Sequence, residues 1–231
     1  MARSGPNLGD GCPLILMRHG FLGGTFDPVH VGHLDVAAAA QHALKLDEVS
    51  FVPSNLPPHR KSFASADDRF AMVELAVQDR RGFVASRLDL DAGGPSYTTG
   101  TLDRIAALGV NPGEVFFITG ADAFRDIRMW KDYPRLLDRC HFVAVSRPGY
   151  PAAGLRGALP DLVARMLDGS SQIPSGSSIL LVDAPTAPVS STEIRRRLTH
   201  GDSIEGLVPG AVATYIQEHG LYRNQPTEER T

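Results

Sequence analysis

The fold can be read outward from GGTFDPVHVGH (residues 23–33), which follows a short apolar run and leads into an Ala-rich helical pattern. Two adjacent glycines let the backbone pass close to a ligand without a Cβ in the way. The helix that follows offers free N–H groups and the positive end of its dipole, which favour an anion. The order of strand, glycine turn and helix therefore predicts a phosphate site at the end of a strand.

Strand-like and helical patterns alternate through the rest of the chain. The strand-like runs are residues 21–22, 49–52, 83–90, 115–119, 141–145 and 179–182, and the helical patterns are residues 34–44, 66–78, 98–108, 159–167, 192–198 and 209–218. Such alternation indicates a parallel sheet with right-handed crossovers. The predicted fold class is α/β, a Rossmann-like doubly wound parallel sheet in a single domain. We expect residues 17–223 to form it, with a disordered extension at 1–16 and a polar tail at 224–231.

Composition excludes several classes of protein. The formal net charge of -3 over 231 residues provides no global positive field for nucleic acid. Cys12 and Cys140 lack the paired spacing of a zinc or redox motif. No run approaches the roughly 20 apolar residues of a membrane span. We therefore expect a cytoplasmic protein that binds neither nucleic acid nor membrane, and the sequence leaves open whether it forms a homo-oligomer.

His30 and His33 lie three residues apart around the predicted helix start. Residues at this spacing share one side of a helix, so both imidazoles can contact one polyphosphate. One alternative is a surface histidine beside a buried one, which is the commoner arrangement for an isolated pair. A zinc site is the other alternative, and it lacks a plausible third ligand.

VSSTEIR (residues 189–195) follows the last predicted strand and starts another helix. Its hydroxyl side chains can cap that helix, as Ser and Thr commonly do, or they can bind phosphate together with free N–H groups. Arg195 lies one turn into the helix, where its planar fork could reach a triphosphate. Arg196 and Arg197 are expected to face solvent.

Both segments resemble signatures of one enzyme family. The first is similar to the His-x-Gly-His signature of nucleotidyltransferases, in the form found in bacterial nicotinate mononucleotide adenylyltransferases, and the second resembles their Ser-Ser-Thr-x-Ile-Arg helix start. The similarity covers residues 17–223. It implies His30, His33 and Arg195 as catalytic residues. It implies ATP binding by Gly23, Gly24, Thr25, Phe26, His59, Arg60, Gly120, Asp122, Ser191 and Thr192.

The middle of the chain resembles the part of this family that holds the mononucleotide. The implied residues are Asn55, Tyr97, Thr98, Trp130 and Arg147. An aromatic face suits the flat, cationic pyridinium ring through stacking and cation–π attraction. A partly buried structural role is the alternative for the tryptophan. Where relatives usually carry a longer residue this sequence has glycine at position 100, which leaves the shape of that helix start open.

The resemblance implies attack by the 5′-phosphate of nicotinate mononucleotide on the α-phosphorus of ATP. A phosphate monoester is already an anion near neutral pH, so no general base is needed. Mg²⁺ is expected to bridge the phosphates. Phosphopantetheine adenylyltransferases share the chemistry and the first motif, and a nucleotide-sensing protein could share the fold without catalysis. The residues alone do not decide between the acid and the amide of the pyridine ring.

Overall fold

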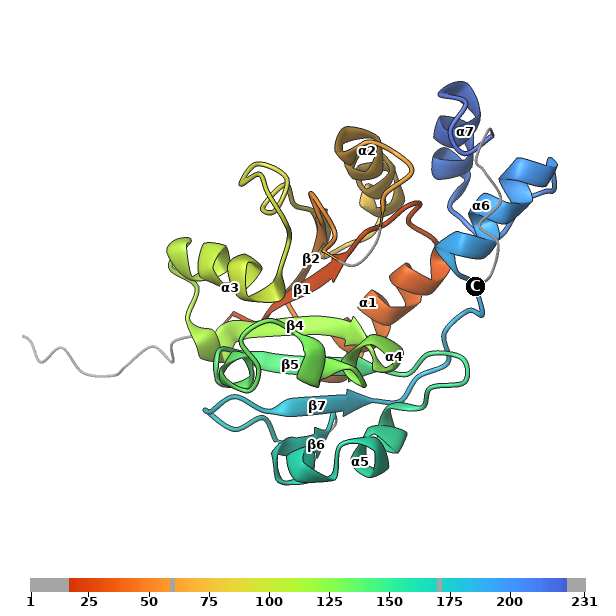
Figure 1. Ribbon diagram of the computed structural model, residues 1–231. Coiled ribbons are helices and arrows are strands. Elements are labelled where there is room, and N and C mark those ends of the chain that lie inside the picture. Colours follow the sequence, from red (N-terminus) through yellow and green to blue (C-terminus); the bar gives the residue numbers. More distant parts are fainter. Residues whose placement is uncertain (1–16, 59–60, 170–171, 224–231) are drawn as a thin grey trace, which may run out of the picture.

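The computed structural model describes residues 17–58, 61–169 and 172–223, and it forms one seven-stranded, all-parallel sheet (Figure 1). The order across the sheet is β3-β2-β1-β4-β5-β7-β6. The strands are β1 (His19–Gly24), β2 (Glu48–Pro53), β3 (Phe83–Ala85), β4 (Val115–Gly120), β5 (His141–Val145), β6 (Met166–Asp168) and β7 (Ile179–Val182). The predicted doubly wound α/β class is confirmed. The predicted extension at residues 1–16 and tail at 224–231 lie outside the described residues.

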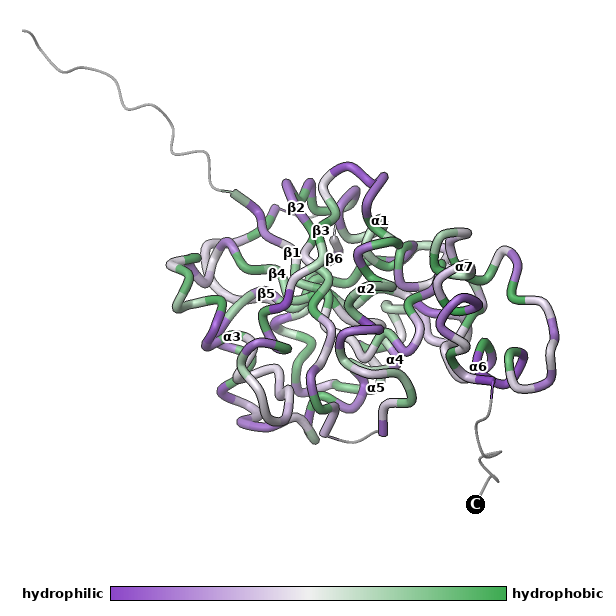
Figure 2. Tube along the Cα trace, turned by 90° about the horizontal axis from the view of Figure 1, so that it is seen from above, coloured by the Kyte–Doolittle hydropathy of each residue, from purple (hydrophilic) through white to green (hydrophobic). Residues whose placement is uncertain are grey.

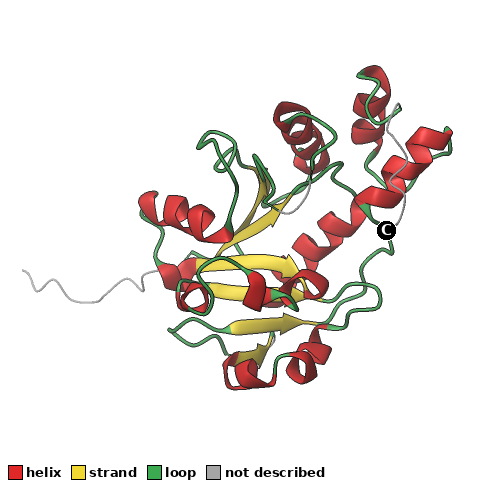
Figure 3. Cartoon of the chain, in the orientation of Figure 1, coloured by secondary structure: helices red, strands yellow, loops and turns green. Residues whose placement is uncertain are grey.

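Helices cover both faces of this sheet (Figure 3). They are α1 (Val31–Leu44), α2 (Ala66–Val77), α3 (Thr98–Ala107), α4 (Ala121–Phe124), α5 (Leu155–Ala158), α6 (Ser191–His200) and α7 (Gly210–Glu218). Short 3₁₀ turns occupy Pro112–Glu114, Ile127–Met129, Arg135–Asp138, Ala152–Gly154 and Pro160–Arg165. Apolar residues of α1, α2, α6 and α7 form one core with the sheet, and those of α3, α4 and α5 form a second core.

The strands supply both cores because alternate side chains point to opposite faces. In β4, Phe116 and Ile118 belong to the core beside α1, whereas Val115 and Phe117 belong to the core beside α3. Figure 2 shows the result, with hydrophobic residues gathered along the central strands and hydrophilic ones on the outer loops. None of the helices in the described ranges is both long and apolar enough to cross a membrane.

The strand β1 marks the switch point of the sheet. It pairs with β2 on one side and with β4 on the other, so successive crossovers leave it in opposite directions. Ligands of open parallel sheets bind at such a point, beyond the carboxyl ends of the strands. The helix α1 starts seven residues after β1 ends, and Figure 1 shows the start of α6 beside it.

Two predicted elements are wrong. The strand predicted at residues 83–90 ends at Ala85, because residues 87–91 turn back on themselves through a bond from the Asp91 N–H to the Arg87 carbonyl. The helix predicted at residues 159–167 is a 3₁₀ turn followed by edge strand β6, in which Met166 pairs with Ile179. Its apolar spacing fits both structures, and periodicity alone does not separate them.

The predicted capping residues lie at the ends of the helices. Ser65 caps α2 by accepting a hydrogen bond from the Asp68 N–H at 3.0 Å. Gly109 and Gly220 follow α3 and α7 with φ of 81° and 60°, a region that favours glycine.

Burial raises the pKa of the free Cys140 thiol to about 12, which leaves it inert.

Candidate active site

A cleft of about 800 Å³ opens at the carboxyl ends of β1 and β4, between the starts of α1 and α6. We call it the signature cleft. Its principal lining residues are Gly23, Gly24, Thr25, Phe26, Asp27, His30, His33, Lys61, Phe63, Thr119, Gly120, Asp122, Arg147, Ser190, Ser191, Thr192 and Arg195. All described residues that the family resemblance assigns to catalysis or ATP binding are among them. His59 and Arg60 lie outside the described residues.

The glycine turn after β1 is tightly packed. A Cβ at Gly24 would lie 2.9 Å from the Phe26 ring, and one at Gly23 would lie 3.1 Å from Phe117. Phe26 itself has a φ of 51°, a conformation that L-residues rarely adopt. The neighbouring rings therefore leave little room for a Cβ at either glycine, and the approach of a ligand to this backbone stays a prediction.

His30 and His33 stack on each other at the start of α1, with ring centroids 3.7 Å apart. The backbone N–H of His30 donates to Nδ1 of His33 at 3.2 Å. Because Nδ1 accepts, a neutral His33 carries its proton on Nε2, which is then a hydrogen-bond donor. Both rings line the signature cleft.

Both histidines are neutral in this environment. Burial, followed by the positive charge of Arg147, lowers the pKa of His30 to about 3. Burial also lowers the pKa of His33 well below its ordinary value, with smaller contributions from His30 and Arg147. Sequence patterns left open whether they act as donors or as cations, and the lowered pKa values favour neutral donors.

The start of α6 contacts the loop after β1 directly. The Ser191 hydroxyl donates to the Pro28 carbonyl at 2.9 Å across 163 positions of sequence. Arg195 donates to the Asp27 carbonyl at 2.8 Å and lies over the Phe63 ring. The cap of α6 is Ser190, which accepts from the Glu193 N–H at 3.2 Å. Capping therefore occupies one hydroxyl and leaves Thr192 exposed at the cleft.

Arg147 links the two signatures. Its guanidinium donates to the Gly32 carbonyl at 3.2 Å and to the Val189 carbonyl at 3.0 Å. A Cβ at Gly32 would lie 2.8 Å from this guanidinium, so any larger residue there would have to displace the Arg147 side chain. The sequence grouped Arg147 with the mononucleotide residues, whereas the structure places it in the signature cleft. It also borders a second, open hollow of about 670 Å³ that includes Pro148, Asp183 and Pro188.

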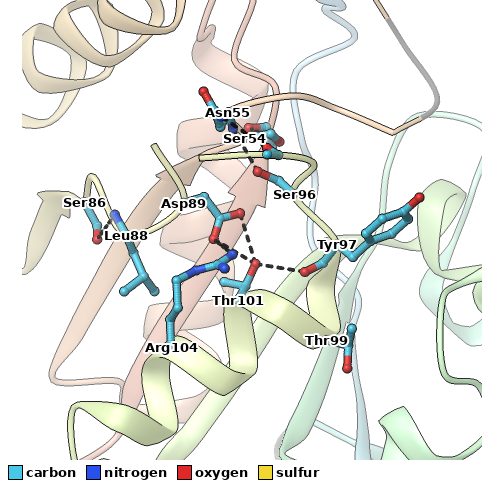
Figure 4. Close-up of polar contacts among 12 residues, drawn as sticks. Ser54, Asn55, Ser86, Leu88, Asp89, Ser96, Tyr97, Thr99, Thr101 and Arg104 are labelled. Carbon is cyan, nitrogen blue, oxygen red and sulfur yellow. Dashed lines mark hydrogen bonds and ion pairs between the residues drawn. The ribbon is translucent and has the colours of Figure 1, made fainter. Parts of the chain in front are cut away.

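The other mononucleotide residues lie around the segment that leads into α3 (residues 94–98), which we call the α3 entry. The Asn55 N–H donates to Ser96 Oγ at 2.8 Å (Figure 4). The Asn55 side-chain amide donates to the Gly94 carbonyl at 3.1 Å. Tyr97 precedes the first helical residue, Thr98, and the Lys131 ammonium lies 5.0 Å from its ring. None of Asn55, Tyr97 and Thr98 is among the principal lining residues of the signature cleft.

Trp130 is half-buried and packs against three phenylalanine rings in T-shaped, edge-on arrangements. Its centroid lies 6.4 to 6.5 Å from those of Phe117, Phe124 and Phe142. The packing role offered as an alternative for Trp130 is thus present in the structure. The predicted stacking of the Trp130 ring on the pyridinium of the mononucleotide stays a prediction.

Sequence reasoning missed three residues that hold the site together. Asp27 is buried and accepts from the N–H groups of Phe63 and Ala64 at 2.7 and 3.1 Å. Tyr222 donates its hydroxyl to Asp27 at 2.7 Å from 195 positions away. Arg69, on α2, donates to carbonyls of the loops after β1 and β2. No local pattern predicts partners so distant in sequence.

Among the residues that the structure describes, no three His, Cys, Asp or Glu side chains cluster in a way that could hold a metal ion.

Arg196 and Arg197 were expected to face solvent. Both form ion pairs with Glu193 on the same helix, at 2.8 and 3.0 Å.

Comparison with known proteins gives consistent matches over most of the chain. A family model described as cytidylyltransferase-like matches residues 21–197. A Thermus thermophilus protein named "probable nicotinate-nucleotide adenylyltransferase" is 45% identical over 90% of this chain and 100% of its own length. A Mycobacterium avium protein of the same name is 39% identical over 89% of this chain and 92% of its own. The fold resembles that of Plasmodium falciparum nicotinic acid mononucleotide adenylyltransferase complexed with NaAD, with a TM-score of 0.69, 17% identity, and coverage of 89% of this chain and 97% of that one.

Proposed function

The chain belongs to the nicotinate-nucleotide adenylyltransferase family, and from this membership and its site we propose the reaction that it catalyses. ATP and nicotinate mononucleotide react to give nicotinate adenine dinucleotide and pyrophosphate, a step of NAD biosynthesis. The observation that supports this most is the meeting of both signatures at one cleft, through the bonds from Ser191 to Pro28 and from Arg195 to Asp27.

The triphosphate of ATP is proposed to lie in the signature cleft between the starts of α1 and α6. Each helix start presents free N–H groups and a positive dipole end. The Nε2–H of His33 adds a neutral donor, and the Arg195 guanidinium adds a fixed positive charge. Donors held in place before the reaction stabilise charge that builds on the α-phosphate and on the leaving pyrophosphate.

The nucleophile is the 5′-phosphate of the mononucleotide. Its second proton leaves near pH ~6, so it is an anion at neutral pH without a general base. Burial lowers the pKa of His30 and of His33, which makes both weak bases, and this agrees with a scheme in which neither removes a proton. The protein contributes in-line placement of two anions and neutralisation of their charge.

Mg²⁺ is proposed to enter with ATP, held by phosphate oxygens and water. When bound, it neutralises charge on the phosphates. The signature cleft supplies basic and neutral donors for the remaining phosphate oxygens, and Asp122 is an exposed carboxylate on its wall.

The mononucleotide is proposed to bind at the α3 entry, with its pyridine ring against Tyr97, Thr98 and the free face of Trp130. The adenine of ATP is proposed to reach the second hollow, since this hollow shares Arg147 with the signature cleft. Its proline side chains offer apolar surface to a flat ring.

A pyrophosphate-release assay with ATP and three acceptors tests this function. Nicotinate mononucleotide should be used best, nicotinamide mononucleotide less well, and phosphopantetheine not at all. Equal or better use of phosphopantetheine would reject the proposed substrate. Thermal stabilisation by ATP without any dinucleotide product would instead indicate a nucleotide-sensing protein.

A further inference from the structure

Arg69 is the largest fully buried side chain in the described part of the chain, with 1% of its surface exposed. It projects from α2, and no described residue forms an ion pair with it. Its Nη1 donates to the carbonyls of Thr25 and Ser54 at 2.8 and 2.7 Å, and its Nη2 donates to the carbonyl of Asn55 at 3.1 Å. All three acceptors are backbone atoms of loops at the carboxyl edge of the sheet.

Burying a guanidinium without an ion-pair partner carries a free-energy cost to the fold. Removing a cation from water costs several kcal/mol, and apolar residues of similar volume often serve stability as well or better. Burial lowers the pKa of Arg69, and the nearby Asp27 carboxylate opposes that shift. Nε of Arg69 is buried and finds no partner within the described residues. Stability alone thus gives a weak account of a guanidinium at this position.

The carbonyls that Arg69 joins belong to different parts of the site. Thr25 lines the signature cleft in the glycine turn after β1. Asn55 lies in the loop after β2 and is bonded to the α3 entry through Ser96 and Gly94, as Figure 4 shows for Asn55 and Ser96. The Arg69 guanidinium therefore connects the wall of the signature cleft to the loop after β2, which is in turn hydrogen-bonded to the α3 entry.

We propose that Arg69 is a positioning residue that sets the separation between the ATP phosphates and the mononucleotide phosphate, so that attack is in line. The inference rests on the proposed function and goes beyond it, because the Arg69 side chain does not itself line the signature cleft and acts through backbone carbonyls of the loops after β1 and β2. A displacement of about 1 Å between reacting groups can lower a rate roughly 100-fold even when each substrate still binds.

The test uses Arg69→Met, which keeps the length and removes the donors, and Arg69→Lys, which keeps the charge without the planar fork. We expect kcat to fall ~100-fold in the methionine variant and ~10-fold in the lysine variant. The Kd values for ATP with Mg²⁺ and for nicotinate mononucleotide, each measured alone by calorimetry, should change less than about threefold, because each loop keeps its own contacts.

Met72→Ala is the matched control, since Met72 is buried on the same helix and belongs to the hydrophobic core. It should lower the melting temperature and leave kcat per folded molecule unchanged. If the Arg69 variants behave like Met72→Ala, or if neither folds, Arg69 serves the fold and the proposal is overturned. The same holds if either Kd rises as much as kcat falls. Failure of the wild-type protein to form dinucleotide would reject the proposed function instead.

Discussion

The signature cleft and the α3 entry are built in different ways, although both are proposed to hold phosphate-bearing substrates. In the signature cleft, side chains and backbone already bond to one another across the two helix starts, as Ser191 does with Pro28. At the α3 entry, the hydrogen bonds join loop to loop, and Tyr97 and Thr98 are not among the lining residues of the signature cleft. In the signature cleft, hydrogen bonds therefore fix the two helix starts relative to each other. At the α3 entry, the shape of the surface depends on how the two loops are held together.

This difference predicts where substitutions act. Changes in the signature cleft should lower kcat, because preorganised donors stabilise the transition state. Changes at the α3 entry should raise KM for the mononucleotide and leave ATP binding intact. The predictions below follow this contrast from the largest expected effect to the smallest.

His33→Ala should lower kcat by a factor of ~100 or more, as for the loss of one transition-state donor. The fold should survive, since the ring lies at a cleft and not in the core. The exposed His42 on the same helix provides a control, and His42→Ala should leave kcat unchanged. Steady-state kinetics of both variants measure kcat, and circular dichroism checks that both are folded. Full activity in His33→Ala would remove this residue from the site.

Acid pH should destabilise the protein through the signature cleft. His30 has a folded pKa of about 3 and an unfolded value near ~6.5, so only the unfolded state binds this proton between them. Stability from this group is complete above pH ~6.5 and is lost as pH falls toward 3, by about 2 kcal/mol at pH 5. Urea titrations of wild type and His30→Asn should show a smaller acid loss in the variant. The lowered pKa values of His33 and His141 contribute an acid loss in both proteins, so the difference between the two titrations reports on His30.

Trp130→Ala should raise KM for nicotinate mononucleotide by ~5-fold with little effect on KM for ATP, since one aromatic contact contributes about 1 kcal/mol. Trp130→Phe should recover most of this affinity. Because three phenylalanines pack against the tryptophan, the alanine variant should also unfold at a lower temperature. A lower melting temperature with an unchanged KM would assign Trp130 to packing alone.

Tyr222→Phe should lower the free energy of unfolding by about 1 kcal/mol, because it removes one hydrogen bond to the buried Asp27. We expect only a few-fold fall in kcat, since Phe63 and Ala64 still hold the same carboxylate. Denaturant unfolding and initial rates measure the two effects. A loss of kcat as large as that of His33→Ala would mean that the carboxyl-terminal contact, and not the helix starts, organises the cleft.

The sequence predicts the signature cleft well because its parts are local. Residues 23–33 contain the strand end, the glycine turn and the helix start, and parallel topology then carries residues 189–195 to the same edge. Arg69 and Tyr222 could not be predicted in this way, since their roles depend on bonds to distant backbone and side-chain atoms. The position of Arg147 was likewise set by the carbonyls of Gly32 and Val189, which no local pattern shows. The sequence also gives no guide to the edge strand at Met166, which is defined by its parallel pairing with Ile179.

A crystal structure with Mg²⁺ and a non-hydrolysable ATP analogue measures the central claim directly. The triphosphate should lie between the starts of α1 and α6, within about 3 Å of both His33 Nε2 and the hydroxyl or N–H groups of Ser191 and Thr192. A triphosphate that contacts only one of these helix starts, or that lies outside the signature cleft, would contradict the account.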